Sequence, residues 1–360
     1  MLFFELIRVA LDCQPCLSRT PSEQEWRELY KESSRQAILG ITYRILTKLP
    51  PEQWPPKKVL VDWFAASRKI IRDNQRLNHD CIWVSAGFTK AGYRNAILKG
   101  QGNALLYPDP LLRTSGDIDI WLDGERDNII GFVTRYFPKA RVQWQEVEFP
   151  IKKKTCIEVH TIPALMFHPG DRRRMEEYFN QHREEIFTNE VELPDEKGYV
   201  RIPTLRVNLT FQLIHIYRHI FYEGIGLRQL VDYFYLLQHC PKEERAELLS
   251  ETATMVHRLH MNRFVSALMW VMQEIFHLQD ELLIMPPNAK EGRFLLNEIM
   301  LAGNFGQYDS RNHHKTSKWG NFWQLTIRNM RFLTHYPREV VWEPWYRISQ
   351  FIWRKRHGFN

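Results

Sequence analysis

The chain has 360 residues, of which 44% are apolar and 25% are charged. This composition is typical of a globular protein that is long enough for two or three domains. No run of about 18 apolar residues occurs, and the first residues lack the basic and apolar regions of a signal peptide, so we expect neither a transmembrane helix nor a leader. The five scattered cysteines favour a cytoplasmic protein over a disulfide framework.

The net charge of +7 is concentrated at the C-terminal end. Residues 311–360 hold ten Lys or Arg residues against two acidic residues, Glu339 and Glu343, a net charge of +8, so the rest of the chain is close to neutral. This aromatic end is compatible with binding to nucleic acid, an anionic membrane surface or an acidic protein. It is also compatible with packed helices whose basic residues are solvated, which is the interpretation we prefer.

The first region, residues 1–92, is predicted to be helical. Ser22 and Glu25 form a capping box ahead of apolar residues at helical spacing. A cluster of prolines follows, and a second, long helix is predicted to begin near Lys57 and to end near Gly92, where glycine can adopt the left-handed conformation of a helix C-terminus.

The second region, residues 93–200, has a different sequence pattern, with short predicted strands and turns. We predict a short strand over residues 95–98, a glycine-bearing turn at 99–103, a short helix, and a strand that contains Asp117 and Asp119. A helix over about residues 125–137 and two β segments, 141–149 and 154–161, follow. We therefore expect a small mixed sheet.

The third region, residues 201–360, is predicted to be helical again. One helix is predicted to begin after Thr204, and further candidates cover about residues 225–240, 242–257, 261–278 and 290–302. An aromatic helix follows, and Pro337 and Pro344 are expected to make the chain irregular up to a short helix at 345–356. The predicted fold class is α+β, with a small sheet at the centre and helical regions on both sides.

Three acidic residues on predicted strands are the main indication of chemistry. Asp117 and Asp119 are two residues apart, so they point to the same face of their strand, and Glu158 alternates in the same way with Ile157 and Val159. If the strands are neighbours, the three carboxylates form an oxygen-rich site of the kind that Mg²⁺ prefers. The alternative is that the carboxylates are exposed or paired with Lys or Arg, but like charges side by side repel, so we favour the metal site.

An ordered set of motifs surrounds these residues, and through it the chain resembles the nucleotidyltransferase superfamily, which includes DNA polymerase beta, poly(A) polymerases and antibiotic nucleotidyltransferases. The resemblance is closest to a bacterial family of poorly characterised nucleotidyltransferases, and it covers about residues 95–162. It implies that the second region, residues 93–200, is the catalytic core of a nucleotidyltransferase. It rests on Leu98-Lys99-Gly100, Tyr107-Pro108-Asp109-Pro110, Arg113 and Gly116-Asp117-Ile118-Asp119.

The resemblance implies that Asp117 and Asp119 bind Mg²⁺ in a site for two ions and that Glu158 is a third ligand or a base. It also implies that the backbone of the turn at Gly100, Gln101 and Gly102 approaches the phosphates of a nucleoside triphosphate. Superfamily members usually carry Ser or Gly in the place of Gln101.

Lys99 and Arg113 are, by the same resemblance, the side chains that neutralise charge on the phosphates. The implied reaction moves a nucleoside monophosphate from an NTP to a hydroxyl of a small molecule or protein and releases pyrophosphate. A nucleotidyltransferase that acts on RNA, with nucleic acid as partner, and a non-catalytic interaction protein are the alternatives. The acceptor is not specified by the sequence.

Two further patterns have both a functional and a structural interpretation. His160 shares the strand face of Glu158 and either has a functional role, in which it orients Glu158 or contacts the nucleotide, or is a satisfied strand histidine. Arg228 and Asp232 are one helical turn apart, and they either face the nucleotide cleft or form a plain salt bridge.

The pair His215 and His219 has the spacing of a helical metal pair, but no third ligand is evident, so we favour packing.

Overall fold

The structure is a computed structural model, and it describes residues 1–196, 198–309, 311 and 318–359. The first part of the chain forms the helices α1 (Leu2–Ala10), α2 (Glu23–Arg35), α3 (Leu39–Tyr43) and α4 (Lys57–Lys90). The middle part forms β1 (Asn95–Ile97), α5 (Gln101–Ala104), β2 (Ile118–Leu122), α6 (Arg126–Tyr136), β3 (Glu146–Glu148), β4 (Ile157–His160), α7 (Pro169–Gln181), α8 (Arg183–Thr188), β5 (Glu190–Glu192) and β6 (Tyr199–Arg201). The last part forms α9 (Leu205–Tyr222), α10 (Leu227–Gln238), α11 (Arg245–Arg258), α12 (Asn262–Phe276), α13 (Ala289–Ala302), α14 (Lys318–Met330) and α15 (Pro337–Arg356).

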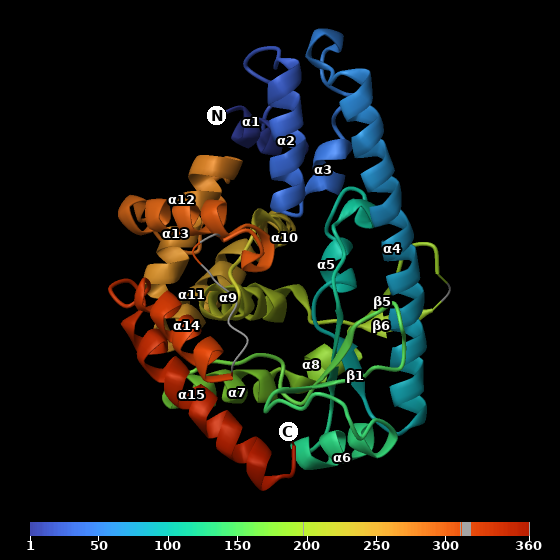
Figure 1. The fold of residues 1–360 in the computed structure, drawn as a ribbon, viewed down its shortest axis with the longest axis vertical. Helices are drawn as coiled ribbons and strands as arrows, with labels where there is room; N and C mark the ends of the chain where they lie inside the picture. Colours follow the sequence, from blue (N-terminus) through green and yellow to red (C-terminus); the bar gives the residue numbers. More distant parts are fainter. Residues whose placement is uncertain (197, 310, 312–317, 360) are drawn as a thin grey trace.

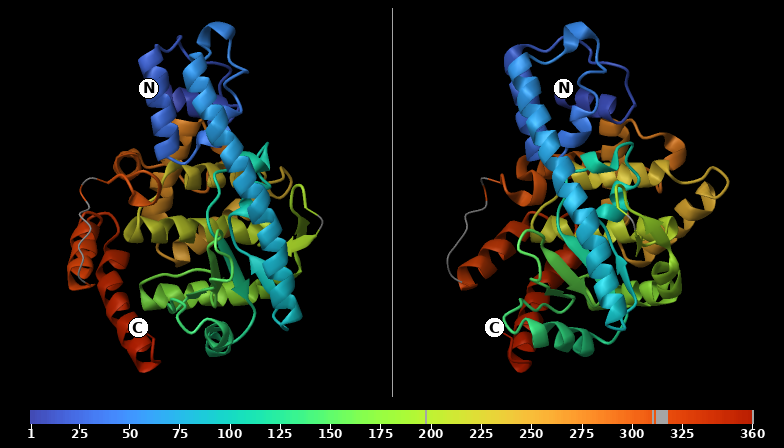
Figure 2. Two further views of the ribbon diagram at one scale, coloured as in Figure 1. Left: turned by 45° about the vertical axis from the view of Figure 1, so that its right-hand side comes forward. Right: turned by 90° about the vertical axis from the view of Figure 1, so that its right-hand side faces the viewer.

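The N-terminal helices follow their local sequence signals. The predicted capping box of α2 is confirmed, because the Ser22 hydroxyl accepts from the backbone N–H of Glu25 and the Glu25 carboxylate accepts from that of Ser22. The predicted limits of α4 are also confirmed, since it begins at Lys57 and ends just before Gly92, whose φ is +90°. Figures 1 and 2 show α4 running from the N-terminal helices down along the sheet.

The predicted small mixed sheet is confirmed, with the strand order β1-β2-β4-β3. The central strand β2 pairs with β1 antiparallel and with β4 parallel, and β3 pairs with β4 antiparallel. The strands are shorter than the predicted β segments. Apolar residues of β2 and β4 such as Ile118, Ile120 and Val159 pack in one core with α4 and α6. Asp119 and Glu158 alternate with them and therefore lie on the opposite face.

The rest of the core is one large apolar cluster. It joins α1 to α3 with the helices α9 to α13 and includes the fully buried Trp26, Trp63 and Phe264. The two regions predicted to be helical therefore pack against each other. The limits of the three regions at residues 92 and 200 stay a prediction.

The C-terminal helix differs from the prediction. Residues 337–344 were expected to be irregular because of Pro337 and Pro344, but α15 begins at Pro337 and includes Pro344. Proline is compatible with the first position of a helix, since the N–H it lacks has no partner there. Pro344 lies inside the helix, and the buried Glu343 and Tyr346 beside it hold that stretch against the rest of the protein.

The architecture as a whole is α+β, as predicted: a small mixed sheet with helical regions before and after it along the chain (Figure 1). All five cysteines are free thiols. Among the residues that the structure describes, no helix combines the length and the apolar character needed to cross a membrane.

Candidate active site

The register of two parallel strands brings an aspartate and a glutamate together. Asp119 of β2 pairs with Glu158 of β4, and His160 lies two residues further along β4 on the same face. Potential ligand atoms of these three residues lie within 4.8 Å of one another, close enough to share one metal ion. In the part of the chain that the structure describes, this is the one cluster of three or more such residues.

Asp119 is held between Lys99 and His160. Its carboxylate is 1% exposed, with Oδ2 at 3.0 Å from Lys99 Nζ and Oδ1 at 2.8 Å from His160 Nε2. Burial alone would raise the pKa of Asp119, but Lys99 and His160 hold it well below its usual range. Asp119 is therefore ionised, and its two neighbours fix its orientation.

His160 donates to Asp119 from Nε2, since an ionised carboxylate can only accept. The same nitrogen is 3.9 Å from Glu146 of β3, a residue that the sequence analysis did not single out. Burial alone would lower the pKa of His160, but the bond to Asp119 and the nearby Glu146 raise it. Of the two interpretations of His160, this geometry favours an orienting role, directed at Asp119 rather than at Glu158.

Glu158 is the carboxylate that the protein leaves uncompensated. The described residues offer it neither a hydrogen bond nor an ion pair. Burial, together with the negative charges of Glu146, Asp119 and Asp117, raises the pKa of Glu158 to about 8. A carboxylate surrounded by others in this way is stabilised by a bound cation, so the donor set fits a divalent metal.

A pocket opens beside this cluster, at the turn after β1. From the region 93–200 it is lined by Lys99, Gly100, Arg113, Gly116 and Asp117, and from the later helices and their connections by Gln212, His215, Arg228, Gln229, Asp232 and Phe305. Gly100 has a φ of +60°, a conformation that favours glycine, which lets the backbone turn sharply at the pocket wall. Asp117 lies just before β2, at the pocket and outside the cluster formed by Asp119.

Arg113 lies at the pocket, but its guanidinium is already occupied. It forms a bidentate pair with Asp232 of α10, with Nε–Oδ1 at 2.8 Å and Nη2–Oδ2 at 2.7 Å, and Tyr107 donates to the same carboxylate at 2.6 Å. Burial alone would lower the pKa of Arg113, but Asp232 raises it. The alternative that Asp232 pairs with Arg228 along the helix is wrong, because the planar fork of Arg113 takes both carboxylate oxygens.

Arg228 of α10 is, in contrast, a buried cation with only neutral partners among the described residues. It is 6% exposed and donates through Nη1 to the carbonyl oxygens of Thr114 and Ser115, which precede β2. Burial, and then the neighbouring Arg113, lower the pKa of Arg228. An anion bound in the pocket would supply the charge that Arg228 lacks.

The other residues of the predicted phosphate turn point elsewhere. The amide of Gln101 donates to Asn78 of α4, and a side chain at Gly102 would contact Ile202 at 3.1 Å. Neither residue is part of the pocket wall, and the approach of their backbone to the phosphates stays a prediction. Asn78 and Asp232 were missed as partners because they are distant in the sequence.

The rings of His215 and His219 meet edge to face on α9, with their centroids 4.3 Å apart. Burial lowers the pKa of both rings. They do not belong to any cluster of three potential ligands among the described residues, in agreement with the packing interpretation.

Comparison with known proteins identifies the family of the chain. No curated protein matches the chain. Among solved structures, an antigenic nucleotidyltransferase-like protein from Paracoccidioides brasiliensis is similar, with 13% identity and a TM-score of 0.36, over 60% of this chain and 96% of that one. A family model described as "Uncharacterised nucleotidyltransferase" matches residues 22–277, more than two thirds of the chain. The chain thus belongs to this nucleotidyltransferase family, as its motifs had suggested.

Proposed function

We propose that the protein is a Mg²⁺-dependent nucleotidyltransferase that moves a nucleoside monophosphate from an NTP to a hydroxyl of a small molecule or protein. One observation carries the proposal: the site holds acidic and basic groups that have no ion pair among the described residues. Glu158 and Asp117 are carboxylates without an ion pair among the described residues, and Arg228 is a buried cation without one. A magnesium nucleoside triphosphate offers the complementary cation and anion together.

Asp119, Glu158 and Asp117 are the residues that would hold the metal, which supplies a positive charge to bind and polarise the triphosphate. Arg228 would contact the phosphates at the pocket wall, and Lys99 is placed between Asp119 and the same pocket. Arg113 is tied to Asp232, so we assign it to the pocket wall with a weaker, longer-range effect on the phosphates.

The reaction that fits this arrangement is substitution at the α-phosphorus. The acceptor oxygen forms a bond to the α-phosphorus, the bond from that phosphorus to the oxygen bridging to the β-phosphate breaks, and pyrophosphate leaves with the bonding electrons. In its ionised form Glu158 can take the acceptor proton, because no ion pair from the described residues occupies it. His160 and Lys99 would keep Asp119 ionised and in position throughout.

The acceptor class is the part of the proposal that experiment has to supply. We propose a cytoplasmic enzyme, in accord with its five free thiols. An RNA acceptor would need a basic surface next to the pocket. Among the described residues, the exposed basic residues of this end of the chain are Arg311, Lys355 and Arg356, and none of them is part of the pocket wall.

Incubation of the protein with α-labelled NTPs, Mg²⁺ and cell extract tests the function. We expect label on a small molecule or protein, with release of pyrophosphate, and loss of both in Asp119→Asn. Glu243→Gln removes an exposed carboxylate elsewhere and serves as the matched control. Label on RNA would select the alternative acceptor. Wild type that neither transfers label nor binds an NTP with Mg²⁺ would indicate a non-catalytic member of the family.

A further inference from the structure

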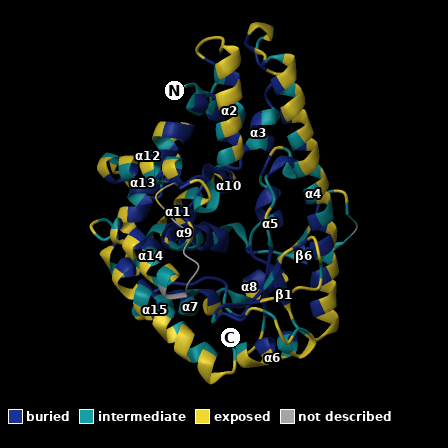
Figure 3. Ribbon diagram, viewed as in Figure 1, coloured by how far each residue is buried: buried dark blue, intermediate teal, exposed yellow. Residues whose placement is uncertain are grey.

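The last helix presents an apolar face to solvent. On α15, Val341, Trp345, Ile348 and Ile352 are spaced as one helical stripe, with exposed fractions between 40% and 62%. Trp342 flanks them and is 38% exposed. Isolated exposed apolar residues are ordinary, but a continuous row along one helix marks an interaction surface. We call these five residues the α15 stripe; Figure 3 shows the exposed outer side of α15 along the edge of the molecule.

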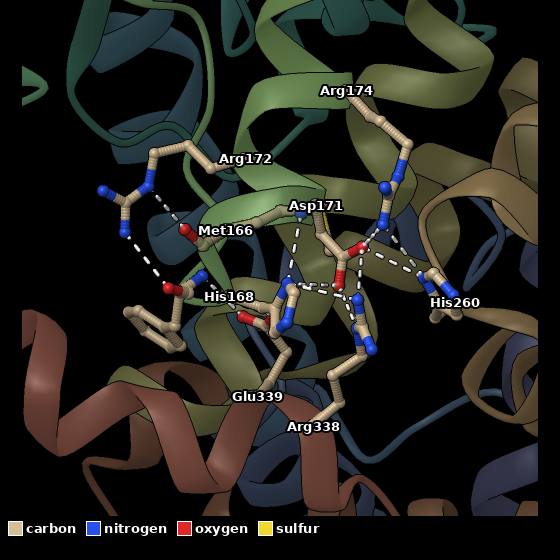
Figure 4. A network of polar contacts seen from close by, with 9 residues as sticks. Met166, His168, Asp171, Arg172, Arg174, His260, Arg338 and Glu339 are labelled. Carbon is tan, nitrogen blue, oxygen red and sulfur yellow. Dashed lines mark hydrogen bonds and ion pairs between the residues drawn. The ribbon is translucent and has the colours of Figure 1, made fainter.

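The opposite face of α15 is fixed to the protein, so the helix cannot turn its stripe inward. Near its start, Glu339 accepts from the backbone N–H groups of Phe167 and His168, and Arg338 pairs with Asp171 of α7. Figure 4 shows this network between α15 and α7.

Further along α15, two more contacts hold the inner face. Tyr346 donates to Gln145 at 2.9 Å, and Gln350 accepts from the backbone N–H of Trp144. Both partners lie in the segment that leads into β3, which carries Glu146 of the site. The helix is therefore anchored to the catalytic core at both ends, and its stripe is left outward.

The acidic side chains of α15 and the basic side chains at its C-terminal end lie on different faces of the helix. Its two carboxylates, Glu339 and Glu343, are 3% and 0% exposed and face the protein. Lys355 and Arg356 at its C-terminal end are exposed. The outer face thus carries apolar and basic side chains and no acidic one, which is the composition of a helix that binds an anionic interface.

We propose that the α15 stripe docks the protein on an anionic lipid surface, with the helix lying in the plane of the headgroups. Tryptophan rings favour the boundary between headgroups and acyl chains, and Lys355 and Arg356 would contact lipid phosphates. α15 lies along the outer edge of the molecule (Figure 1), so the α15 stripe can meet an extended surface such as a membrane along the length of the helix. A second copy of the chain is a less suitable partner, because two chains that each carry a net charge of +7 repel each other. The proposal is independent of nucleotidyl transfer.

Co-sedimentation of the full chain with vesicles tests this docking. The vesicles contain phosphatidylcholine alone or phosphatidylcholine with an equal amount of phosphatidylglycerol. We expect binding to the anionic vesicles only, and a partition coefficient that falls roughly tenfold or more in Trp345→Ser/Ile348→Ser, because two side chains no longer enter the interface. Lys355→Gln/Arg356→Gln should lose roughly 30-fold, which corresponds to about 1 kcal/mol for each basic residue.

The matched control is Val61→Ser/Phe64→Ser, which removes two exposed apolar residues of α4 and should bind as wild type does. Thermal unfolding of each variant checks that the fold is retained. Absence of wild-type binding to anionic vesicles, or equal binding by wild type and the α15 variants, overturns the proposal. So does dimerisation, or capture of an acidic protein, that depends on Trp345 and Ile348 in a chain that does not bind vesicles.

Discussion

Replacement of Glu158 by glutamine should make the metal-free protein more stable, and more so at higher pH. In the folded protein the Glu158 carboxyl keeps its proton up to about pH 8, whereas in the unfolded chain it loses it near its ordinary value of 4.5. Between these values the folded state binds more protons than the unfolded state, so the free energy of unfolding falls as the pH rises. Glutamine does not titrate, so Glu158→Gln removes this loss.

The size of the effect follows from the difference between the two pKa values. A shift from 4.5 to about 8 corresponds to an upper limit of about 5 kcal/mol, at about 1.4 kcal/mol for each unit. Glu158 is not fully buried, and solvent and small movements of Glu146 relieve part of the repulsion, so we expect about 2 kcal/mol. The two proteins should therefore be equally stable near about pH 5 and differ by about 2 kcal/mol near about pH 9.

Urea unfolding in the presence of a chelator measures this difference at both pH values. Glu243→Gln removes an exposed carboxylate far along the chain, and its difference in stability from wild type should be the same at both pH values. Addition of Mg²⁺ near pH 9 should stabilise the wild type more than Glu158→Gln, since a ligand that binds only the folded state adds to its stability. If wild type and Glu158→Gln differ in stability by the same amount at both pH values, the raised pKa of Glu158 is refuted. If Mg²⁺ stabilises both proteins equally, the metal assignment is refuted.

Three other substitutions test the rest of the site. Asp119→Asn should abolish nucleotidyl transfer and lower the free energy of unfolding by about 3 kcal/mol, because two cationic neighbours lose their carboxylate; transfer of label and urea unfolding measure the two effects. Asp232→Asn should cost about 3 to 5 kcal/mol in urea unfolding, since Arg113 would be left buried without its partner, and a loss below about 1 kcal/mol would contradict the assigned pair. Arg228→Gln should weaken NTP binding in calorimetry by roughly tenfold or more while nucleoside binding is unchanged, and an equal loss for both ligands would argue against a phosphate contact.

The elements that were predicted correctly are those whose limits depend on local chemistry. The capping box at Ser22 and the prolines before Lys57 act within a few residues, so the start of α2 and of α4 could be placed from the sequence. The start of α15 was placed wrongly because Pro337 was treated as a break, although it occupies the first turn. No individual elements were predicted for residues 162–200, where the packing of α7, α8 and the β5–β6 pair on the rest of the chain decides the structure.

In the site, sequence spacing placed side chains on faces but could not pair distant residues. The alternation of β2 and β4 predicted that Asp119 and Glu158 share a face, and the parallel register brings them side by side. The partner of Arg113 is 119 residues away, and the sequence offered the nearer Arg228 as partner of Asp232 instead. A bidentate pair in a buried place is stronger than a single turn-to-turn contact, so the tertiary partner prevails.

The long-range pair also bears on which part of the chain is needed for activity. Arg113 and Lys99 come from the predicted catalytic core, but Asp232 and Arg228 come from α10 and close the same pocket. Without α10, Arg113 would be a guanidinium without its carboxylate, and the carbonyl oxygens before β2 would lose the donor that orders them. The strand that carries Asp119 is therefore positioned in part by a helix that follows it by more than a hundred residues. The later helices belong to the candidate active site, and residues 93–200 alone should not form it.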